Sequence, residues 1–285
     1  LRGAGWLVEP LRLILRALYL RRRLGHRIRL FYGIPFKVGS KKVMDRSDIQ
    51  ENLFSLYLRL NGYFVTGFIV HASLGNKTEI DALAVRFPYH REPEREIGVS
   101  PILDASDSVL DFLVCEVKGG TGNFNFNASF REDPETIASV LNRFGAFTDE
   151  EVTSLVPRIQ DVLRPENIQK SQEYPTIGIP RINSRIRFAL VAPDQKRSAK
   201  SKRPYIYGDD MISYIWECFR PEVQRPLCGV RYNWNLWGEQ YIKLVKYFKD
   251  KDRAEPGDIE GVYANFGLPT FNRTLYPGAQ TTRAG

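Results

Sequence analysis

Hydrophobic and polar positions divide the middle of the chain into helix-like and strand-like segments. Residues 47–60 are predicted to form a helix, because apolar side chains recur there at helical spacing. These side chains are Ile49, Leu53, Leu56 and Leu60. Ser47 and Asp48 are candidate caps at its start, and Asn61-Gly62 is a pair that commonly ends a helix.

Strand-like runs follow this helix. They are rich in β-branched and aromatic residues, and they cover 63–72, 79–87, 110–118 and, further on, 185–193. The stretch 88–108 is polar and contains proline, so we expect an inserted loop or hairpin there. Further helical patterns cover 134–145, 148–163, 209–219 and 236–251, and the tail after Arg253 is expected to be extended. The order helix, three strands, helices, strand and helix predicts an α/β layer fold.

The segment 6–23 is the most apolar part of the N-terminal region. Arg12 and Arg16 interrupt it and Pro10 limits its start, so it is too short for a transmembrane span. We expect an amphipathic helix that docks on this protein or on a partner, with a peripheral membrane anchor as the alternative. A basic cluster follows it. The chain starts with Leu1 rather than Met, which leaves open whether residues precede it.

Composition adds two expectations. With 43% hydrophobic and 26% charged residues the chain is typical of globular proteins, and 41 Lys and Arg against 33 Asp and Glu give a net charge of +8. This balance favours a polyanionic partner such as nucleic acid. The cysteines Cys115, Cys218 and Cys228 form no CxxC pair, so a cytoplasmic or other reducing compartment is expected and a structural zinc site is not. Cys115 is interpreted as a small buried hydrophobic residue.

The candidate chemistry lies in two of the predicted strands. Glu116 and Lys118 end the run DFLVCEVK on the same strand face, and Asp81 lies in the preceding strand. If these strands pair, the two carboxylates converge at the end of a sheet, where burial is costly unless a cation neutralises them. Mg²⁺ accepts a few carboxylates and keeps positions for water and a phosphate oxygen. With Lys118 orienting the attacking water, this arrangement predicts a phosphodiester hydrolase.

Two further acids belong to this hypothesis. Glu51 lies at the border of the apolar face of the first helix, from which a carboxylate can lean toward the end of the sheet. The alternative is a surface glutamate near a helix start. Glu79 shares a strand with Asp81, so either a second metal or a basic neighbour is its expected partner.

On these residues the sequence resembles the PD-(D/E)xK nuclease superfamily, and within it the Holliday-junction resolvase-type nucleases. The matching stretches are the helix that carries Glu51, NGYF after it, TEIDALAV with Asp81, and CEVK with Glu116 and Lys118. The resemblance implies a restriction-endonuclease-like α-β-β-β-α-β core with a mixed central sheet. It also implies that Asp81 and Glu116 bind Mg²⁺ or Mn²⁺ with assistance from Glu51, and that Lys118 is catalytic.

The sequence departs from the family pattern in three places. The interval between Asp81 and Glu116 is longer than in the compact resolvases, which places the insert beside the active face. No Gln is followed four residues later by Tyr, so the additional motif of the RecB-type branch is absent. Ile80 stands where the family motif has proline. None of these departures removes a predicted metal ligand.

A basic segment provides a candidate nucleic-acid contact. Its cations, with no acid among them, are Lys196, Arg197, Lys200, Lys202 and Arg203. Contact with a phosphate backbone and a solvated loop are both consistent with such a run.

Together these features predict a Mg²⁺-dependent nuclease, more an endonuclease than an exonuclease, that acts on DNA in repair, recombination or defence against foreign DNA. The alternatives are a catalytically silent nuclease-fold module that binds nucleic acid or a partner protein, and an RNA-directed nuclease. The expected organisation is a basic helical extension over 1–45, a nuclease-like core over 46–230, and a C-terminal helix and tail over 231–285. Many relatives cut as dimers, so a homodimer is expected; a partner protein bound through the N-terminal helix is the other possibility.

Overall fold

The computed structural model describes residues 44–71, 77–91, 97–198, 203–220, 238–249 and 254–269. They belong to one compact unit that begins at Met44. The predicted N-terminal helix and basic cluster lie outside the described residues, so those predictions remain open. Within the described ranges, each helix is too short or too polar to cross a membrane.

The first described helix, α2, covers Arg46–Leu60. Its N-cap is Asp45, and not Ser47 or Asp48 as the sequence suggested. Asp45 accepts the Asp48 N–H at 2.9 Å, and the Asp48 carboxylate accepts the Asp45 N–H at 3.1 Å, which completes a capping box. The predicted end is confirmed: Asn61 is the C-cap, and Gly62 has a φ of +83°.

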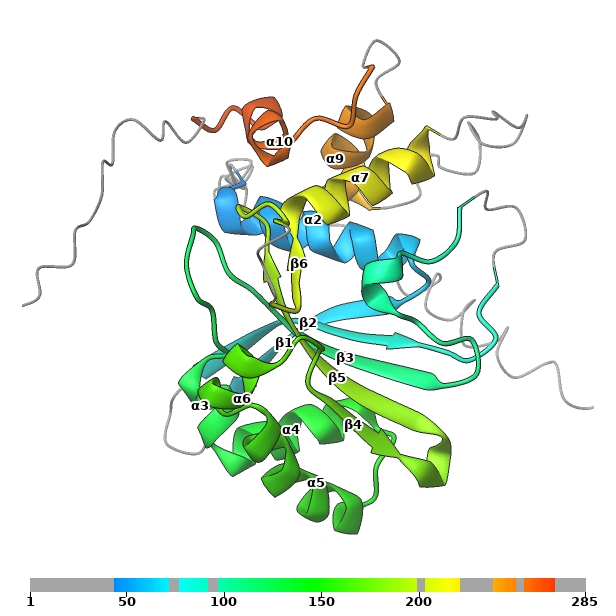
Figure 1. Cartoon of the computed structure of the whole chain (residues 1–285), viewed down its shortest axis with the longest axis vertical. Helices are drawn as coiled ribbons and strands as arrows, with labels where there is room; N and C mark the ends of the chain where they lie inside the picture. The colour runs from blue at the N-terminus through cyan, green and yellow to red at the C-terminus, as the bar shows by residue number, and fades with distance from the viewer. Residues whose placement is uncertain are drawn as a thin grey trace, which may run out of the picture. The chain divides into compact units, whose positions relative to one another are not determined.

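Six strands form one mixed sheet (Figure 1). They are β1 Phe64–His71, β2 Lys77–Arg86, β3 Leu110–Val117, β4 Thr176–Ile179, β5 Ser184–Ala192 and β6 Tyr205–Tyr207. The order is β1-β2-β3-β5-β4, and β6 also pairs with β5. The β1–β2, β2–β3 and β4–β5 pairs are antiparallel, whereas β3–β5 and β5–β6 are parallel. The chain is therefore an α/β protein, as predicted, although β4 and β6 were not anticipated.

The other described helices follow β3 in the sequence. They are α3 Ala128–Glu132, α4 Pro134–Phe144, α5 Asp149–Val162, α6 Pro165–Lys170, α7 Gly208–Phe219, α9 Glu239–Lys249 and α10 Ile259–Asn265. The 3₁₀ turns η1 Pro101–Leu103 and η2 Pro180–Ile182 lie in connecting segments. The helix α10 corrects the expectation of an extended tail, since Asp258 caps it by accepting the Gly261 N–H at 3.0 Å.

The helices cover both faces of the sheet (Figure 1). Residues of α2, α7, α9 and α10 form one buried cluster with alternate residues of β3, among them Leu113 and Cys115. Residues of α3, α4, α5 and α6 form the other cluster, with Phe112 and Val114. The strand β3 is thus covered on both faces, which explains its nearly continuous apolar sequence. Cys115 and Cys218 are buried and free, whereas Cys228 lies outside the described residues.

Candidate functional site

Asp81 lies at an irregular point of the sheet. In the β1–β2 ladder two residues of β2, Asp81 and Ala82, face the single residue Gly67 of β1, which makes a β-bulge. A bulge bends its strand and re-aims the side chains beside it. The Oδ2 atom of Asp81 accepts the Val117 N–H at 2.6 Å, so this carboxylate is fixed against the end of β3.

Glu116 and Lys118 lie at that end of β3. The Glu116 side chain is fully buried, and its two carboxylate oxygens accept the Asn127 N–H at 3.1 and 3.0 Å. The Lys118 Nζ atom lies 2.5 Å from Glu116 Oε2 and donates to Asn127 Oδ1 at 2.7 Å. The Lys118 N–H donates to Val191 O at 2.8 Å, which fixes the backbone of this lysine beside β5. The structure therefore brings Glu116 and Lys118 together, with Asp81 bonded to the residue between them.

Glu51 is the third acid of the cluster. It is half-buried on α2, and burial followed by the charge of Asp81 raises its pKa to about 7. The charge of Glu79 raises the pKa of Glu51 further, to a smaller extent than that of Asp81. The same charge of Glu79 raises the pKa of Asp81, and Glu79 itself is exposed. The charge of Asp81 thus acts on Glu51 across the gap between β2 and α2, because partly buried charges are weakly screened.

The buried acids are only partly neutralised. Burial raises the pKa of Asp81 and of Glu116, and each shift is opposed by the charge of Lys118. The charge of Asp81 also raises the pKa of Glu116. The charge of Asp81 thus acts on both glutamates, and we call Glu51, Asp81 and Glu116 the acidic cluster.

A divalent metal ion would fit the chemistry of the acidic cluster. Within the described ranges, no group of three or more His, Cys, Asp or Glu side chains is gathered as a complete metal site. Glu116 instead accepts the Asn127 N–H and pairs with Lys118. Carboxylate oxygens are nevertheless the donors that Mg²⁺ prefers, and Mg²⁺ is commonly held by one or two carboxylates and waters. Asp81 and Glu116 are the residues that would hold it.

Sequence reasoning missed a second polar network beside the cluster. Asp194 Oδ2 accepts the Gly120 N–H at 2.6 Å and the Gln50 side-chain amide at 3.0 Å. The Tyr263 hydroxyl donates to Asp194 Oδ1 at 2.5 Å and accepts from Gln50 at 2.6 Å. These contacts tie α2, the turn after Lys118, the loop after β5 and α10 together. Of the residues in this network, only Gln50 could have been noticed in the sequence, because it is adjacent to Glu51.

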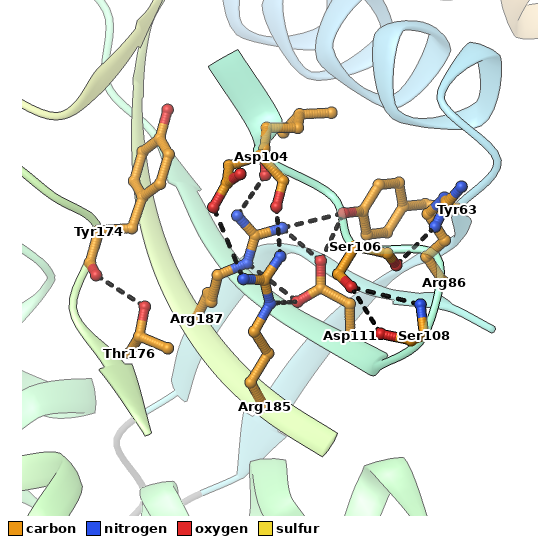
Figure 2. Close-up of polar contacts among 11 residues, drawn as sticks. Tyr63, Arg86, Asp104, Ser106, Ser108, Asp111, Tyr174, Thr176, Arg185 and Arg187 are labelled. Carbon is orange, nitrogen blue, oxygen red and sulfur yellow. Dashed lines mark hydrogen bonds and ion pairs between the residues drawn. The ribbon is translucent and has the colours of Figure 1, made fainter. Parts of the chain in front are cut away.

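A third polar network lies at the other end of β3 (Figure 2). The fully buried Asp111 accepts Arg187 Nε at 2.9 Å and Arg185 Nε at 3.1 Å, and it accepts the Tyr63 hydroxyl at 2.6 Å. Arg187 also donates to Leu103 O. This network joins β3, β5, the residue before β1 and the turn η1, and none of its members was predicted to be functional.

The predicted nucleic-acid contacts are placed in part. Arg197 donates to both carboxylate oxygens of Asp210 at 3.0 Å, and Lys196 lies 3.7 Å from Asp258. Arg203 donates to the Tyr205 hydroxyl at 3.3 Å. Lys200 and Lys202 lie outside the described residues. The basic segment is therefore held by side-chain contacts on both sides of the residues 199–202, which are not described.

Comparison with models of protein families, with curated proteins and with solved structures found no match to this chain.

Proposed function

We propose that this chain is a metal-dependent nuclease with a restriction-endonuclease-like core of the PD-(D/E)xK type. The observation that carries the proposal is the bond from the Val117 N–H to Asp81, which joins Asp81 to the strand end that holds Glu116 and Lys118. The order α2, β1, β2, β3, crossover helices and a parallel β5 supports it, because it is the order expected for that core.

Each residue of the site has a role in this proposal. Asp81 and Glu116 hold Mg²⁺, with Mn²⁺ as a substitute, and Glu51 assists from α2. When bound, the ion supplies charge neutralisation for the scissile phosphate and activation of the attacking water. Lys118, whose side chain is 22% exposed, would orient the attacking water. DNA is the proposed substrate, with RNA as the alternative.

Cleavage assays with matched variants test the proposal. Supercoiled, linear, single-stranded and branched DNA, and RNA, are incubated with the protein in Mg²⁺, Mn²⁺ or chelator. We expect metal-dependent cleavage that Lys118→Ala and Asp81→Asn each reduce at least about a hundredfold. Lys170→Ala, an exposed lysine at the end of α6, is the control and should cleave normally. Cleavage that survives both site substitutions would contradict the proposed mechanism.

A second candidate is a nuclease-fold module that binds nucleic acid without cutting it. The observation that favours it is the closed state of Glu116, whose oxygens are held by Asn127 and Lys118. Binding that persists in chelator, together with no cleavage of any of these substrates, would support this candidate and exclude the first.

A further inference from the structure

A notch in the edge of the sheet forms a pocket away from the acidic cluster. Two short strands share one edge of β5: β4 pairs with Ser184–Arg187, and β6 pairs with Leu190–Ala192. A pocket of about 680 Å³ lies between the start of β4 and the segment that precedes β6. Thr176 and Pro204 are among its lining residues. This volume is in the range of pockets that hold a small organic ligand.

Four arginines line this pocket, which we call the arginine pocket. They are Arg185, Arg187, Arg197 and Arg203. They come from β5 and from both ends of the basic segment that follows it, so the fold gathers cations that are dispersed in the sequence. Such a gathering of guanidinium groups is typical of sites for phosphate, which their planar forks bind through paired hydrogen bonds.

Two aspartates outside the lining hold three of these arginines, whereas Asp104, which lines the pocket, lies 3.8 Å from Arg185. Arg185 and Arg187 are bonded to the buried Asp111 (Figure 2), and Arg197 is bonded to Asp210. Neither Asp111 nor Asp210 lines the pocket, whereas all four arginines do. Arg187 is itself buried, so the cationic surface of the pocket comes from Arg185, Arg197 and Arg203, which are not buried.

Arg203 has the most donors left for a ligand. It donates to the Tyr205 hydroxyl and lies 6.0 Å from the centre of that ring. Within the described ranges it forms no ion pair with a carboxylate, and a guanidinium group has five N–H donors. An anion in the pocket would provide the missing partner.

The remaining lining limits what the anion can be. Tyr174, Ile102 and Pro204 supply apolar surface, so the pocket suits an organic ligand better than a bare ion. Asp104 and Glu173 also line it, and both are exposed, so they would oppose an anion from the solvent side. We propose that the arginine pocket binds a phosphorylated ligand of nucleotide size, with the phosphate on Arg197 and Arg203 and the organic part against Tyr174.

This site is distinct from the proposed catalytic site. Arg187 pairs with Leu113, three residues before Glu116 in β3. At a rise of about 3.3 Å per residue, the strand positions of Leu113 and Glu116 are roughly 10 Å apart. The proposal needs neither a metal ion nor cleavage, so it stands or falls separately from the nuclease proposal.

Binding measurements in chelator test it with the full chain. The probes are adenosine diphosphate, adenosine as the probe that lacks phosphate, and a short 5′-phosphorylated DNA single strand. Calorimetry or fluorescence anisotropy should show binding of the phosphorylated probes and not of adenosine. The two phosphorylated arms distinguish a free nucleotide from a nucleic-acid end as the source of the phosphate.

Matched variants locate the site. Arg203→Gln should weaken binding about tenfold, and for the DNA probe it should reduce the slope of log K against log salt by about one. Glu173→Gln should tighten binding severalfold, a result that a folding defect cannot produce. Arg158→Gln, an exposed arginine on α5, makes the same charge change elsewhere and should leave binding unchanged.

Two results would overturn the proposal. One is equal binding of adenosine and adenosine diphosphate, and the other is an equal effect of Arg203→Gln and Arg158→Gln. Failure of the cleavage assays would leave these measurements unaffected.

Discussion

Two carboxylates of one strand, Asp111 and Glu116, are fully buried, and their partners differ in kind. Asp111 is held by two guanidinium groups and a tyrosine hydroxyl, all from well-packed elements. Glu116 is held by one backbone amide and by a lysine that is partly exposed. The first set cannot be exchanged without breaking the core. The second could be exchanged for an entering cation, which is why we propose the catalytic site at the Glu116 end of β3.

The Asp111 end of β3 gives the first prediction. Arg187→Met should lower the free energy of unfolding by about 3 kcal/mol, because it leaves the buried Asp111 with an incomplete set of partners. Urea unfolding measures the loss. Arg181→Gln removes an exposed arginine that is bonded to Glu151, and it should cost much less stability than Arg187→Met, because exposed ion pairs contribute little. Equal losses in the two variants would show that the Asp111 network contributes no more than a surface ion pair.

The acidic cluster gives a pH-dependent prediction through Glu51. Its pKa is raised to about 7, so the folded protein favours the protonated form. The stability that this preference provides is complete below the pKa of an unfolded glutamate and is lost as the pH rises through about 7. Glu51→Gln should therefore stabilise the metal-free protein at about pH 8, by about 1 kcal/mol after allowance for solvent screening, and have little effect at about pH 4.

Thermal unfolding in chelator at the two pH values measures this difference. Glu217→Gln on α7 is the control, since Glu217 is exposed. A stabilisation by Glu51→Gln that is equal at both pH values would contradict the electrostatic explanation.

At the scale of elements, the start of α7 packs closely against the loop after β5. A Cβ atom on Gly208 would lie 2.0 Å from the backbone oxygen of Pro193, a contact that no side-chain rotation can relieve. Gly208→Ala should therefore separate α7 from the loop after β5 and destabilise the protein by more than about 2 kcal/mol.

Gly178→Ala in β4 is the matched control, because nothing lies within 4 Å of its added Cβ atom. Urea unfolding of the two variants should give a large loss for Gly208→Ala and a small effect for Gly178→Ala. Similar unfolding midpoints would mean that the junction relaxes easily.

The elements also show which parts of the fold a sequence can predict. The four long strands were predicted because β-branched and apolar runs mark them directly. The strands β4 and β6 are only four and three residues long, and they form because β5 offers them an open edge. The tail was expected to be extended from its Gly, Pro and Asn content. The spacing of Ile259, Val262 and Tyr263 was the helical signal there.

The site was predictable to the extent that its members are neighbours in the sheet. Glu116 and Lys118 are two residues apart on a strand, and Asp81 lies on the adjacent strand, so alternation and pairing bring them together. The residues that fix their surroundings, Asn127 and Tyr263, reach the site through the crossover and through α10. No local pattern records such long-range packing, which explains why both were missed.

At the scale of the whole molecule, α10 and α2 are joined to the proposed catalytic strand end by one chain of hydrogen bonds. Tyr263 and Gln50 meet at Asp194, which in turn accepts the N–H of Gly120, two residues after Lys118. The C-terminal helices also share a buried cluster with α2. The region around Glu51 is thus packed from segments at both ends of the described chain, so events at the acidic cluster are expected to affect global stability.

Metal binding should therefore be visible as stabilisation of the whole fold. At about pH 8 the three acids carry repelling charges, and an ion held by Asp81 and Glu116 removes that repulsion. At about a hundredfold excess over its dissociation constant, Mg²⁺ should add nearly 3 kcal/mol to the free energy of unfolding. Asp81→Asn keeps an oxygen that accepts the Val117 N–H but lacks the charge, so this variant should fold normally in chelator and gain no stability from Mg²⁺. Thermal unfolding of both proteins, with and without Mg²⁺, makes the comparison, and equal stabilisation of the two would show that the ion binds elsewhere.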